Sequence, residues 1–391
     1  MSYKEELLGD YIDILSGFAF KTKDFVDNGV PIIKIKNISP PCVTLDDLTY
    51  VSNEVAEKQK KFILSYDDVL IAMTGSHINQ WASVVGRVAR VKYSDKTLLN
   101  QRVGKITIKD NAEADINYIY YYLSQDTVKI ELAAKAGGAA NQANISSAHI
   151  KDLSFPCPDL AIQHKIGNIL RAYDDLIENN QKQLQLLEEA AQRLYKEWFV
   201  DLHFPGYEDV EIVDGVPEGW SKEPIGSIIC KASRTKQIKT ADYLLEGTIP
   251  VIDQSRNFIA GYTNDTEALV NTGTPVIVFG DHTRVLKYIQ FPFAKGADGT
   301  QLIISDRTNM PQSLLYSSLI AVDLSNYHYA RHFKYLKTEA ILIPSQDVAD
   351  EFDRLISPIF SQIEKFREKC YKLSQARDRL LPKLMSGEIE V

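Results

Sequence analysis

The stretch Pro158–Phe199 constrains this fold most strongly, because its apolar residues recur at helical spacing from one end to the other. The steps alternate between three and four residues, and Asn180 interrupts their phase once. At about 1.5 Å per residue such a helix would be about 60 Å long. No single globular core covers a stripe of that length, so we expect a second long helix beside it. The predicted stripe consists of Ile162, Ile166, Ile169, Tyr173, Leu176, Leu184, Leu187, Ala191, Leu194 and Trp198.

The chain supplies the second helix as an internal repeat. A shift of 186 positions lays Pro158 on Pro344 and keeps the apolar residues of the two stretches in register. Two unrelated amphipathic helices would share no common offset. Pro358 lies inside the second copy, where it is expected to remove one backbone hydrogen bond and kink the helix. The residues predicted to hold the helices together or to dock partners are Ile166, Tyr173, Leu187, Leu194, Trp198, Phe352, Leu355, Leu373 and Leu380.

Composition limits the number of domains and the classes of protein that fit this sequence. With 391 residues and 45% apolar content, the chain can bury a core and is predicted to form two or more domains. It has no apolar run of the roughly 20 residues that a membrane span needs, and its start, MSYKEELLGD, does not read as a signal peptide. We therefore expect no membrane partner and a cytoplasmic protein, in which the four scattered cysteines stay reduced.

The net charge of −8 seems to argue against a polyanionic partner, but its distribution weakens that objection. Segment 201–224 alone contains seven acidic residues and one lysine, so the rest of the chain is close to neutral. Local basic faces are compatible with such a distribution. Total charge therefore decides little about the partner.

The predicted fold class is α+β, with two strand-rich mixed domains and two long helices packed as an antiparallel coiled coil, related by a pseudo-twofold internal repeat. Ile32–Lys36, Val69–Met73 and Val103–Ile108 are predicted strands, and Ile116–Ser124 is a predicted short helix. Scattered stretches of the second domain echo the first, such as 247–252 and 274–278. The predicted order is domain 1–157, helix 158–200, acidic connector 201–224, domain 225–343 and helix 344–391.

Motifs of catalysis are missing from the sequence. It contains no GxxxxGK[ST] or GxGxxG phosphate loop, no HExxH and no [DE]-x-K triplet. Ser39-Pro40-Pro41-Cys42 is similar to the tetrapeptide of amino-methyltransferases, but Cys42 cannot stack on a flipped base and we interpret the segment as a turn. We therefore predict no catalytic residue, no metal site and no cofactor in this chain.

Polar residues follow the predicted buried strands in both domains. Asn and Gln amides can read adenine bidentately in the major groove, and Arg or Lys can read guanine. Each residue alone is also consistent with an ordinary solvated loop, and their matching placement in two domains is the stronger argument. The predicted DNA-binding residues are Lys36, Asn37, Ser76, His77, Asn79, Gln80, Arg102, Gln142 and Asn144 in the first domain, and Asp281, His282, Thr283, Arg284, Lys287, Arg331, His332 and Lys334 in the second. Gly137-Gly138 would let the backbone approach a phosphate, and Lys295 and Gln301 add polar side chains nearby in sequence.

Several stretches carry a family resemblance: Pro158-Asp159-Leu160 with Gln163, Leu194–Asp201 with Phe204-Pro205-Gly206, Gly215–Trp220, and the ending Leu380–Ile389. At these residues the chain resembles the specificity subunit (HsdS family) of type I restriction-modification enzymes. The resemblance covers the whole chain, while the interiors of the domains are variable in this family.

The resemblance implies two target recognition domains, each reading one half of a split double-stranded DNA site, with the coiled coil setting the spacer. It also implies that the subunit has no activity alone. Two adenine-methylating subunits using S-adenosylmethionine would dock on it, and two restriction/translocase subunits using ATP and Mg would join for cleavage. The second helix departs from the pattern, since it has Asp-Val-Ala-Asp at 347–350 where the first has the Gln163 motif. Equal docking of both methyltransferase copies is therefore in doubt.

Two alternatives stay open at this stage. The first is a protein-interaction scaffold that uses the same coiled coil without DNA. Its binding would lack the steep salt dependence of phosphate contacts. The second is an enzyme with an unrecognised site at Pro40-Pro41, which turnover by the isolated chain would reveal.

Overall fold

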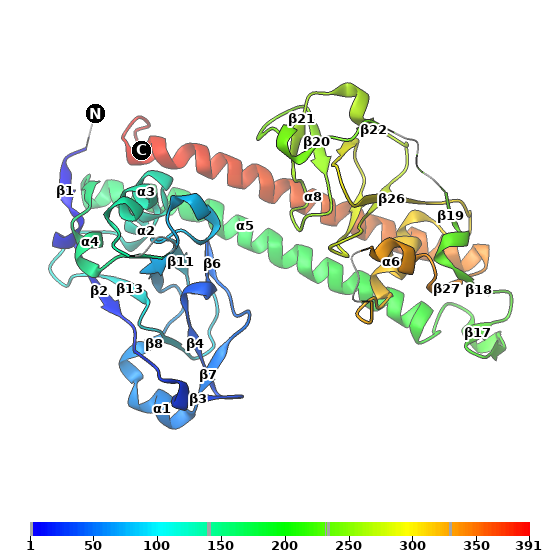
Figure 1. The fold of residues 1–391 in the computed structure, drawn as a ribbon, viewed down its shortest axis with the longest axis horizontal. Helices are drawn as coiled ribbons and strands as arrows, with labels where there is room; N and C mark the ends of the chain where they lie inside the picture. Colours follow the sequence, from blue (N-terminus) through cyan, green and yellow to red (C-terminus); the bar gives the residue numbers. More distant parts are fainter. Residues whose placement is uncertain (1–2, 139–141, 231, 233–234, 328–330) are drawn as a thin grey trace. The chain divides into compact units, whose positions relative to one another are not determined.

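The computed structural model describes residues 3–138, 142–230, 232, 235–327 and 331–391. They form two compact units: unit 1 comprises residues 1–177 with 371–391, and unit 2 comprises residues 178–370. The two long helices are α5 (Leu160–Tyr195), which ends in a π-helical turn at Lys196–Val200, and α8 (Gln346–Met385). Each unit contains one part of each long helix. Figure 1 draws α5 in green and α8 in orange to red.

Unit 1 contains two mixed sheets and two short strand pairs. The larger sheet has the strand order β2-β13-β9-β11-β6-β5, and the smaller has the order β3-β7-β4-β12-β8, in which β4 and β12 run parallel. Strand β1 pairs with β15, and β10 pairs with β14. The strands are β1 (Glu5–Leu7), β2 (Ile12–Ser16), β3 (Phe25–Val26), β4 (Val30–Ile33), β5 (Ile38–Ser39), β6 (Cys42–Val43), β7 (Thr49–Val51), β8 (Ile63–Leu64), β9 (Val69–Ala72), β10 (Thr74–Gly75), β11 (Val88–Arg90), β12 (Thr97–Leu99), β13 (Val103–Ile108), β14 (Ala143–Asn144) and β15 (Ser154–Pro156).

Unit 2 repeats this plan with fewer strands. Its sheets have the orders β19-β26-β23-β24 and β21-β20-β25-β22, and β20 runs parallel to β25 as β4 does to β12. The pair β18–β27 corresponds to β1–β15. The duplication therefore extends to the globular parts. The strands are β16 (Ile212–Val213), β17 (Val216–Pro217), β18 (Ser221–Pro224), β19 (Ile229–Cys230), β20 (Ile249–Ile252), β21 (Gly261–Thr263), β22 (Leu269–Val270), β23 (Val276–Gly280), β24 (Leu286–Ile289), β25 (Phe293–Lys295), β26 (Thr300–Ser305) and β27 (Ala340–Ile343).

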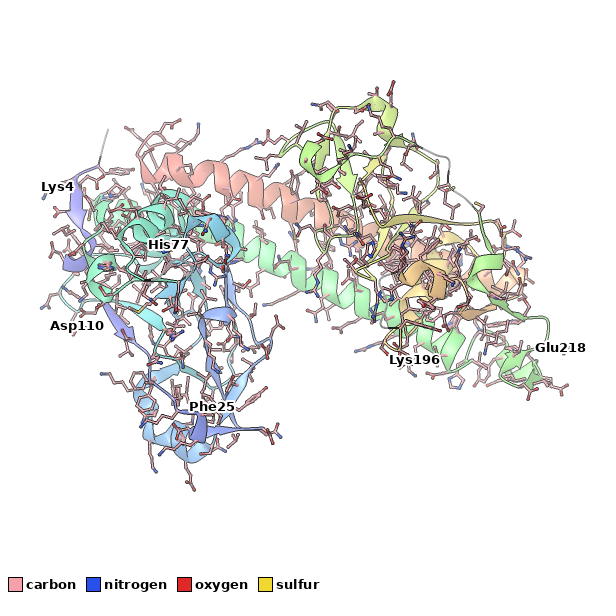
Figure 2. The ribbon with its side chains drawn as sticks, viewed as in Figure 1. Lys4, Phe25, His77, Asp110, Lys196 and Glu218 are labelled. Atoms are coloured by element: carbon pink, nitrogen blue, oxygen red, sulfur yellow. The ribbon has the colours of Figure 1, made fainter. Side chains whose placement is uncertain are left out.

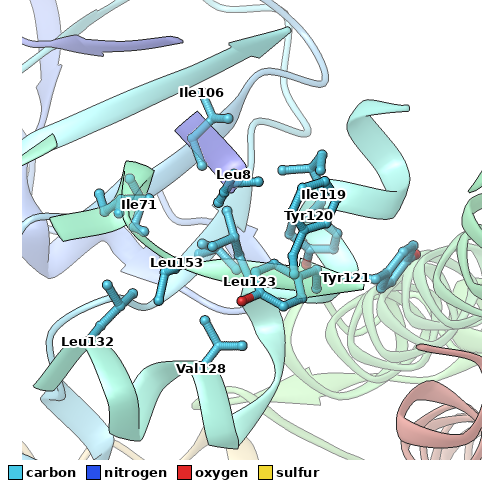
Figure 3. Close-up of a cluster of buried hydrophobic side chains, with 14 of the residues drawn as sticks. Leu8, Ile71, Ile106, Ile119, Tyr120, Tyr121, Leu123, Val128, Leu132 and Leu153 are labelled. Carbon is cyan, nitrogen blue, oxygen red and sulfur yellow. The ribbon is translucent and has the colours of Figure 1, made fainter. Parts of the chain in front are cut away.

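Short helices close the core of each unit. In unit 1, α2 starts where the Asp115 carboxylate accepts a hydrogen bond from the Tyr118 N–H at 2.8 Å, and its apolar side chains join the core shown in Figure 3. In unit 2, α6 occupies the equivalent place after β26. The short helices are α1 (Asn53–Lys58), α2 (Ile116–Ser124), α3 (Asp126–Lys135), α4 (Ser147–Lys151), α6 (Gln312–Ala321) and α7 (His332–Leu336).

The long helices run antiparallel within each unit. In unit 1, the Arg377 guanidinium of α8 contacts the Asp174 carboxylate of α5 at 2.5 Å, and Lys165 reaches the backbone carbonyl of Val391. In unit 2, Arg367 contacts Glu188 at 2.5 Å, and the ring of Phe352 lies 5.6 Å from that of Trp198. The predicted coiled-coil pairing and the α+β class are confirmed.

The phase of the predicted stripe is wrong in its first half. Ile169 and Leu176 are 37% and 51% exposed, whereas their neighbours Leu170 and Ile177 are buried. Likewise Leu355 is 36% exposed while Ile356 is buried. All three errors fall on apolar doublets, where spacing alone does not choose between adjacent residues. The observed stripe continues without a break of phase, with Asn180 as a regular member, through Gln163, Ile166, Leu170, Tyr173, Ile177, Asn180, Leu184, Leu187, Ala191, Leu194 and Trp198.

One local prediction changes and another stays open. Helix α8 extends through Pro358 as one element, Gln346–Met385, and the kink expected at this proline stays a prediction. The predicted strand Ile32–Lys36 ends early: β4 stops at Ile33, and Ile35–Asn37 forms a 3-10 turn. By contrast, the helix Ile116–Ser124 and the strand Val103–Ile108 are confirmed at their predicted bounds.

A glycine sets how closely α5 packs against α2. A Cβ atom added at Gly167 would lie 2.6 Å from the Asp115 carboxylate and 2.9 Å from the Asn117 side chain. Gly167→Val is therefore expected to lower the free energy of unfolding by about 1–3 kcal/mol, measured by urea denaturation. Asn168→Val is the matched control, because the neighbouring side chain is exposed and only the helix propensity changes. Equal effects of the two variants would contradict the packing argument.

Candidate nucleic-acid interface

In unit 1 the loop between β10 and β11 presents the predicted polar cluster. Its 3-10 turn, Ile78–Ser83, is held by the buried Ser76, whose hydroxyl donates to the Gln80 carbonyl at 2.6 Å and lies 2.9 Å from the Ser83 hydroxyl. The side chains of Asn79 and Gln80 are exposed, and His77, labelled in Figure 2, is half-buried. The loop thus presents amide side chains on a turn fixed from inside.

Two further segments that are distant in sequence meet this loop. Strand β10 pairs with β14, and the Thr74 hydroxyl donates to the Asn144 side-chain oxygen at 2.8 Å. The backbone N–H of Met73 donates to the Arg102 carbonyl at 2.9 Å. The structure therefore brings the exposed Arg102, Gln142 and Asn144 close to the loop. Gly137 pairs with Asn144 through two backbone bonds, and residues 139–141 of the predicted glycine-rich loop lie outside the described residues.

The turn at Lys36 and Asn37 differs from its prediction as a donor surface. Asn37 is buried, and its amide bonds the Lys34 N–H at 3.0 Å and the Asp46 carbonyl at 2.9 Å. The Lys36 ammonium forms an ion pair with Asp47. Both side chains are therefore engaged within the protein, and Asn37 shapes the turn.

Arg87 links this turn to the loop and was not identified from the sequence. Its guanidinium donates to the Ala82 carbonyl at 2.9 Å and to the Ile35 carbonyl at 3.3 Å. Burial lowers the pKa of Arg87 below its usual value. Its role depends on two backbone carbonyls that are far apart in sequence, so no local pattern could have revealed it.

In unit 2 the corresponding loop follows β23. The Gln254 side chain organises it by accepting from the His282 N–H at 3.1 Å, while the Thr283 hydroxyl donates to the Gln254 carbonyl at 2.6 Å. Arg284 lies in the left-handed region with φ +61°. The side chains of His282, Thr283 and Arg284 are exposed. This loop therefore repeats the post-strand position of the cluster in unit 1.

Helix α7 packs directly on this loop. The buried Asp281 accepts from the Phe333 N–H through its carboxylate at 2.8 Å and from the His332 N–H through its backbone carbonyl at 2.9 Å. The Arg284 guanidinium lies 3.3 Å from His332 Nε2 and donates to the Tyr327 carbonyl at 3.0 Å. Burial and the nearby Arg284 charge lower the pKa of His332, which favours the neutral imidazole as acceptor. Asp281 and His332 thus position the exposed Arg331 and Lys334.

Lys287 is buried rather than presented to a ligand. It is 3% exposed, and its ammonium donates to the backbone carbonyls of Asp253 at 2.8 Å and Asn257 at 2.5 Å. Burial lowers its pKa to about 8, against a smaller opposing effect of the Asp253 carboxylate. Lys287 therefore anchors the segment that carries Gln254.

The predicted residues fall into two groups. Buried side chains that position the loops are Asn37, Ser76, Asp281, Lys287 and His332. Side chains at the surface are Lys36, which pairs with Asp47, and His77, Asn79, Gln80, Arg102, Gln142, Asn144, His282, Thr283, Arg284, Arg331 and Lys334. Contact of this second group with DNA stays a prediction.

Among the described residues, no group of three or more His, Cys, Asp or Glu is arranged to hold a metal ion. Within the same residues, no helix is both long and apolar enough to cross a membrane.

Comparison with known proteins places this architecture in a class. A crystal structure described as the S subunit of a type I restriction-modification system from M. genitalium matches 98% of this chain and 96% of its own, with a TM-score of 0.63 and 15% sequence identity. That likeness establishes the fold. A family model described as the type I restriction modification DNA specificity domain matches residues 3–189.

Sequence relatives agree with the structural match. The MjaIX specificity subunit of Methanocaldococcus jannaschii is 27% identical over 335 residues, covering 78% of this chain and 76% of the relative. The EcoR124I/EcoR124II specificity subunit of Escherichia coli is 28% identical over 199 residues, covering 46% of this chain and 48% of the relative. In sequence, the chain is therefore similar to type I restriction-modification specificity subunits (HsdS family), over residues 3–189 for the family model and over 78% of its length for the M. jannaschii relative.

The lowered pKa of Lys287 predicts a pH-dependent stability. Between about pH 8 and about pH 10.5 the unfolded chain keeps this proton while the folded chain releases it, so the free energy of unfolding rises with pH. The variant Lys287→Met lacks the ammonium group that releases this proton. The stability of the native chain relative to this variant should therefore increase between about pH 7.5 and about pH 9.5 in urea denaturation. A difference that stays constant with pH would contradict the assignment.

Proposed function

We propose that the chain reads a bipartite DNA target, with one half-site per unit, and holds the methyltransferase and restriction subunits of a type I restriction-modification complex. The observation that carries the proposal is the duplicated loop. In both units, exposed polar side chains follow a buried central strand, β9 in unit 1 and β23 in unit 2. Different side chains on one repeated scaffold suit two different half-sites.

Within this proposal the chain itself is not catalytic. It would position the duplex, while partner subunits bind S-adenosylmethionine, ATP and Mg and carry out adenine methylation or cleavage. The similarity to specificity subunits supports this division of labour.

Two equivalent grooves support the docking of two partner copies. The groove of unit 1, about 470 Å³, is lined by Tyr120, Tyr121 and Ser124 of α2 and by Arg377 and Leu381 of α8. In unit 2, a groove of about 530 Å³ is lined by Tyr316, Ser317 and Ile320 of α6 and by Ala191 and Tyr195 of α5. The short-helix residues correspond at an offset of 196 positions and the long-helix residues at an offset of 186. Each groove therefore lies at the same place in the repeat.

The two grooves differ in chemistry. In unit 2, the rings of Tyr288, Tyr316 and Phe360 pack together at centroid distances of 4.9–5.4 Å. In unit 1 the guanidinium of Arg90 lies over the Tyr120 ring at 4.2 Å, and Asp174 pairs with Arg377. The unit 2 groove is also lined by the Glu188–Arg367 ion pair, so the aromatic cluster is its main difference from the unit 1 groove. Grooves of different composition would bind one partner surface with unequal affinity.

A charge placed beside the aromatic cluster of the unit 2 groove should weaken one docking event. Ile320 is 39% exposed and lines the groove, so Ile320→Asp is expected to release one of two methyltransferase subunits, as seen by native mass spectrometry of the assembled complex. Leu269→Asp is the control, because Leu269 is 37% exposed and does not line the groove. Full retention of both subunits by the Ile320 variant would contradict docking there.

Substitutions in one loop should alter one half-site only. Asn79→Ala with Gln80→Ala removes exposed amides from unit 1, and His282→Ala changes unit 2. Each bidentate base contact contributes about 1–3 kcal/mol of discrimination, so each variant should relax methylation at its own half-site by about 5–150-fold. Sequencing of methylated DNA measures this. If either variant relaxed both half-sites together, the assignment of one half-site to each unit would fail.

The length of the helices should set the spacer. An insertion of seven residues, about two turns, at facing positions of α5 and α8 adds about 10 Å. The spacer is expected to grow by about three base pairs while the half-sites stay the same. Methylation mapping of the insertion variant measures the spacer. An unchanged spacer would refute this role of the helices.

A further inference from the structure

Unit 2 contains a polar pocket of about 590 Å³ next to the candidate interface. Its walls include Lys295 of β25, Lys337 at the end of α7, and the amides of Gln237 and Gln301. None of the described residues that line it is acidic. Phe333 also lines the pocket, and its backbone N–H bonds Asp281 of the recognition loop. The pocket and the loop are therefore adjacent.

The two lysines have no counter-ion among the described residues. The Lys337 ammonium lies 5.2 Å from the centre of the Phe333 ring, a contact that leaves its charge uncompensated by a carboxylate. Lys295 is half-buried, and burial lowers its pKa. A partly desolvated ammonium without an anion is unfavourable, and a bound anion would remove that cost.

The first copy of the repeat provides an internal comparison for Lys337. Its counterpart is Lys151, since Gly9 packs on Lys151 as Gly226 packs on Lys337. The Lys151 ammonium forms an ion pair with Asp13 of β2 at 2.8 Å. The position of Asp13 corresponds to that of Cys230 in β19, because each is the second residue of the strand that pairs with the long strand β13 or β26. Unit 2 has a thiol where unit 1 has the neutralising carboxylate.

Lys295 is a second position at which unit 2 is more positively charged than unit 1. It pairs with Ile252 across the parallel strands β25 and β20, as Leu99 pairs with Ile33 across β12 and β4. Leu99 is fully buried in the core of unit 1. A core leucine of one copy is thus a lysine in the other. One difference adds a positive charge and the other removes a negative charge, so both make this pocket more positive.

We propose that this pocket binds a phosphate group and, within the function proposed above, holds one backbone phosphate of the half-site read by unit 2. Ammonium and amide donors suit phosphate oxygens, which accept several charge-assisted hydrogen bonds. Such a contact would fix the register of the duplex on unit 2 and carry no base information itself.

The test uses the complex assembled with its methyltransferase subunits and a short duplex containing the target. Lys295→Met keeps the length of the side chain and removes its charge. It should weaken DNA binding and reduce the slope of log K against log salt by about one, with the methylated sequence unchanged. Lys295→Arg should keep the slope. Lys236→Met is the charge-matched control in unit 2, since Lys236 pairs with Asp265 and should leave the slope unchanged.

Titration with inorganic phosphate, followed by ³¹P line broadening, separates the possible sources of the phosphate group. Broadening by the native chain that is lost in Lys295→Met supports the pocket even if no split target is found, so this arm is independent of the proposed function. Phosphate binding with an unchanged DNA salt slope would overturn the assignment to the DNA backbone. No broadening by the native chain, together with an unchanged DNA salt slope in the double variant Lys295→Met with Lys337→Met, would overturn the pocket itself.

Discussion

The apolar contact between α5 and α8 is the interaction on which both units depend. In unit 1, Ile166 and Leu170 of α5 share a core with Leu384 and Met385 of α8. In unit 2, Trp198 shares a core with Phe352 and Ile356. The buried residues of α2 and of α6 belong to the same cores as residues of both long helices. The stripe therefore acts as part of two cores and not only as a connection between them.

The two copies of this scaffold have different residues at several equivalent positions. Gln163, which is buried and bonds the Asp115 N–H at 3.1 Å, corresponds to the buried Ala349 in the second copy. Gly167, which allows close packing of α2, corresponds to Asp353, which instead accepts hydrogen bonds from Ser313 and Ser357. Two different solutions thus hold a short helix on a long one. The same freedom gives the two units grooves and loops of different chemistry on one frame.

Much of the fold could be predicted because its signals are local. Helical periodicity located α5 and α8, and alternation located β13. Periodicity could not choose between Ile169 and Leu170, because that choice depends on the surface each residue meets. Loop composition correctly suggested a polar turn after β9, since exposed Asn79 and Gln80 are there.

The candidate site was less predictable because burial of polar residues is a long-range property. Lys287 and His332 read as surface donors in the sequence, yet distant backbone carbonyls and the loop around Asp281 enclose them. Arg87 and Gln254 organise the loops only through such contacts. The lysine at position 295, which has no counter-ion in the part of the chain that the structure describes, stands out only in a strand-by-strand comparison of the two copies.

The central claim is that two units with different loops read two separate pieces of DNA. The most direct test is to assemble the native chain with its methyltransferase subunits and to map every methylated adenine on a long random-sequence DNA. The account predicts one asymmetric target made of two short defined half-sites, separated by a spacer of fixed length and free sequence. A single continuous target, or methylation without sequence preference, would contradict it.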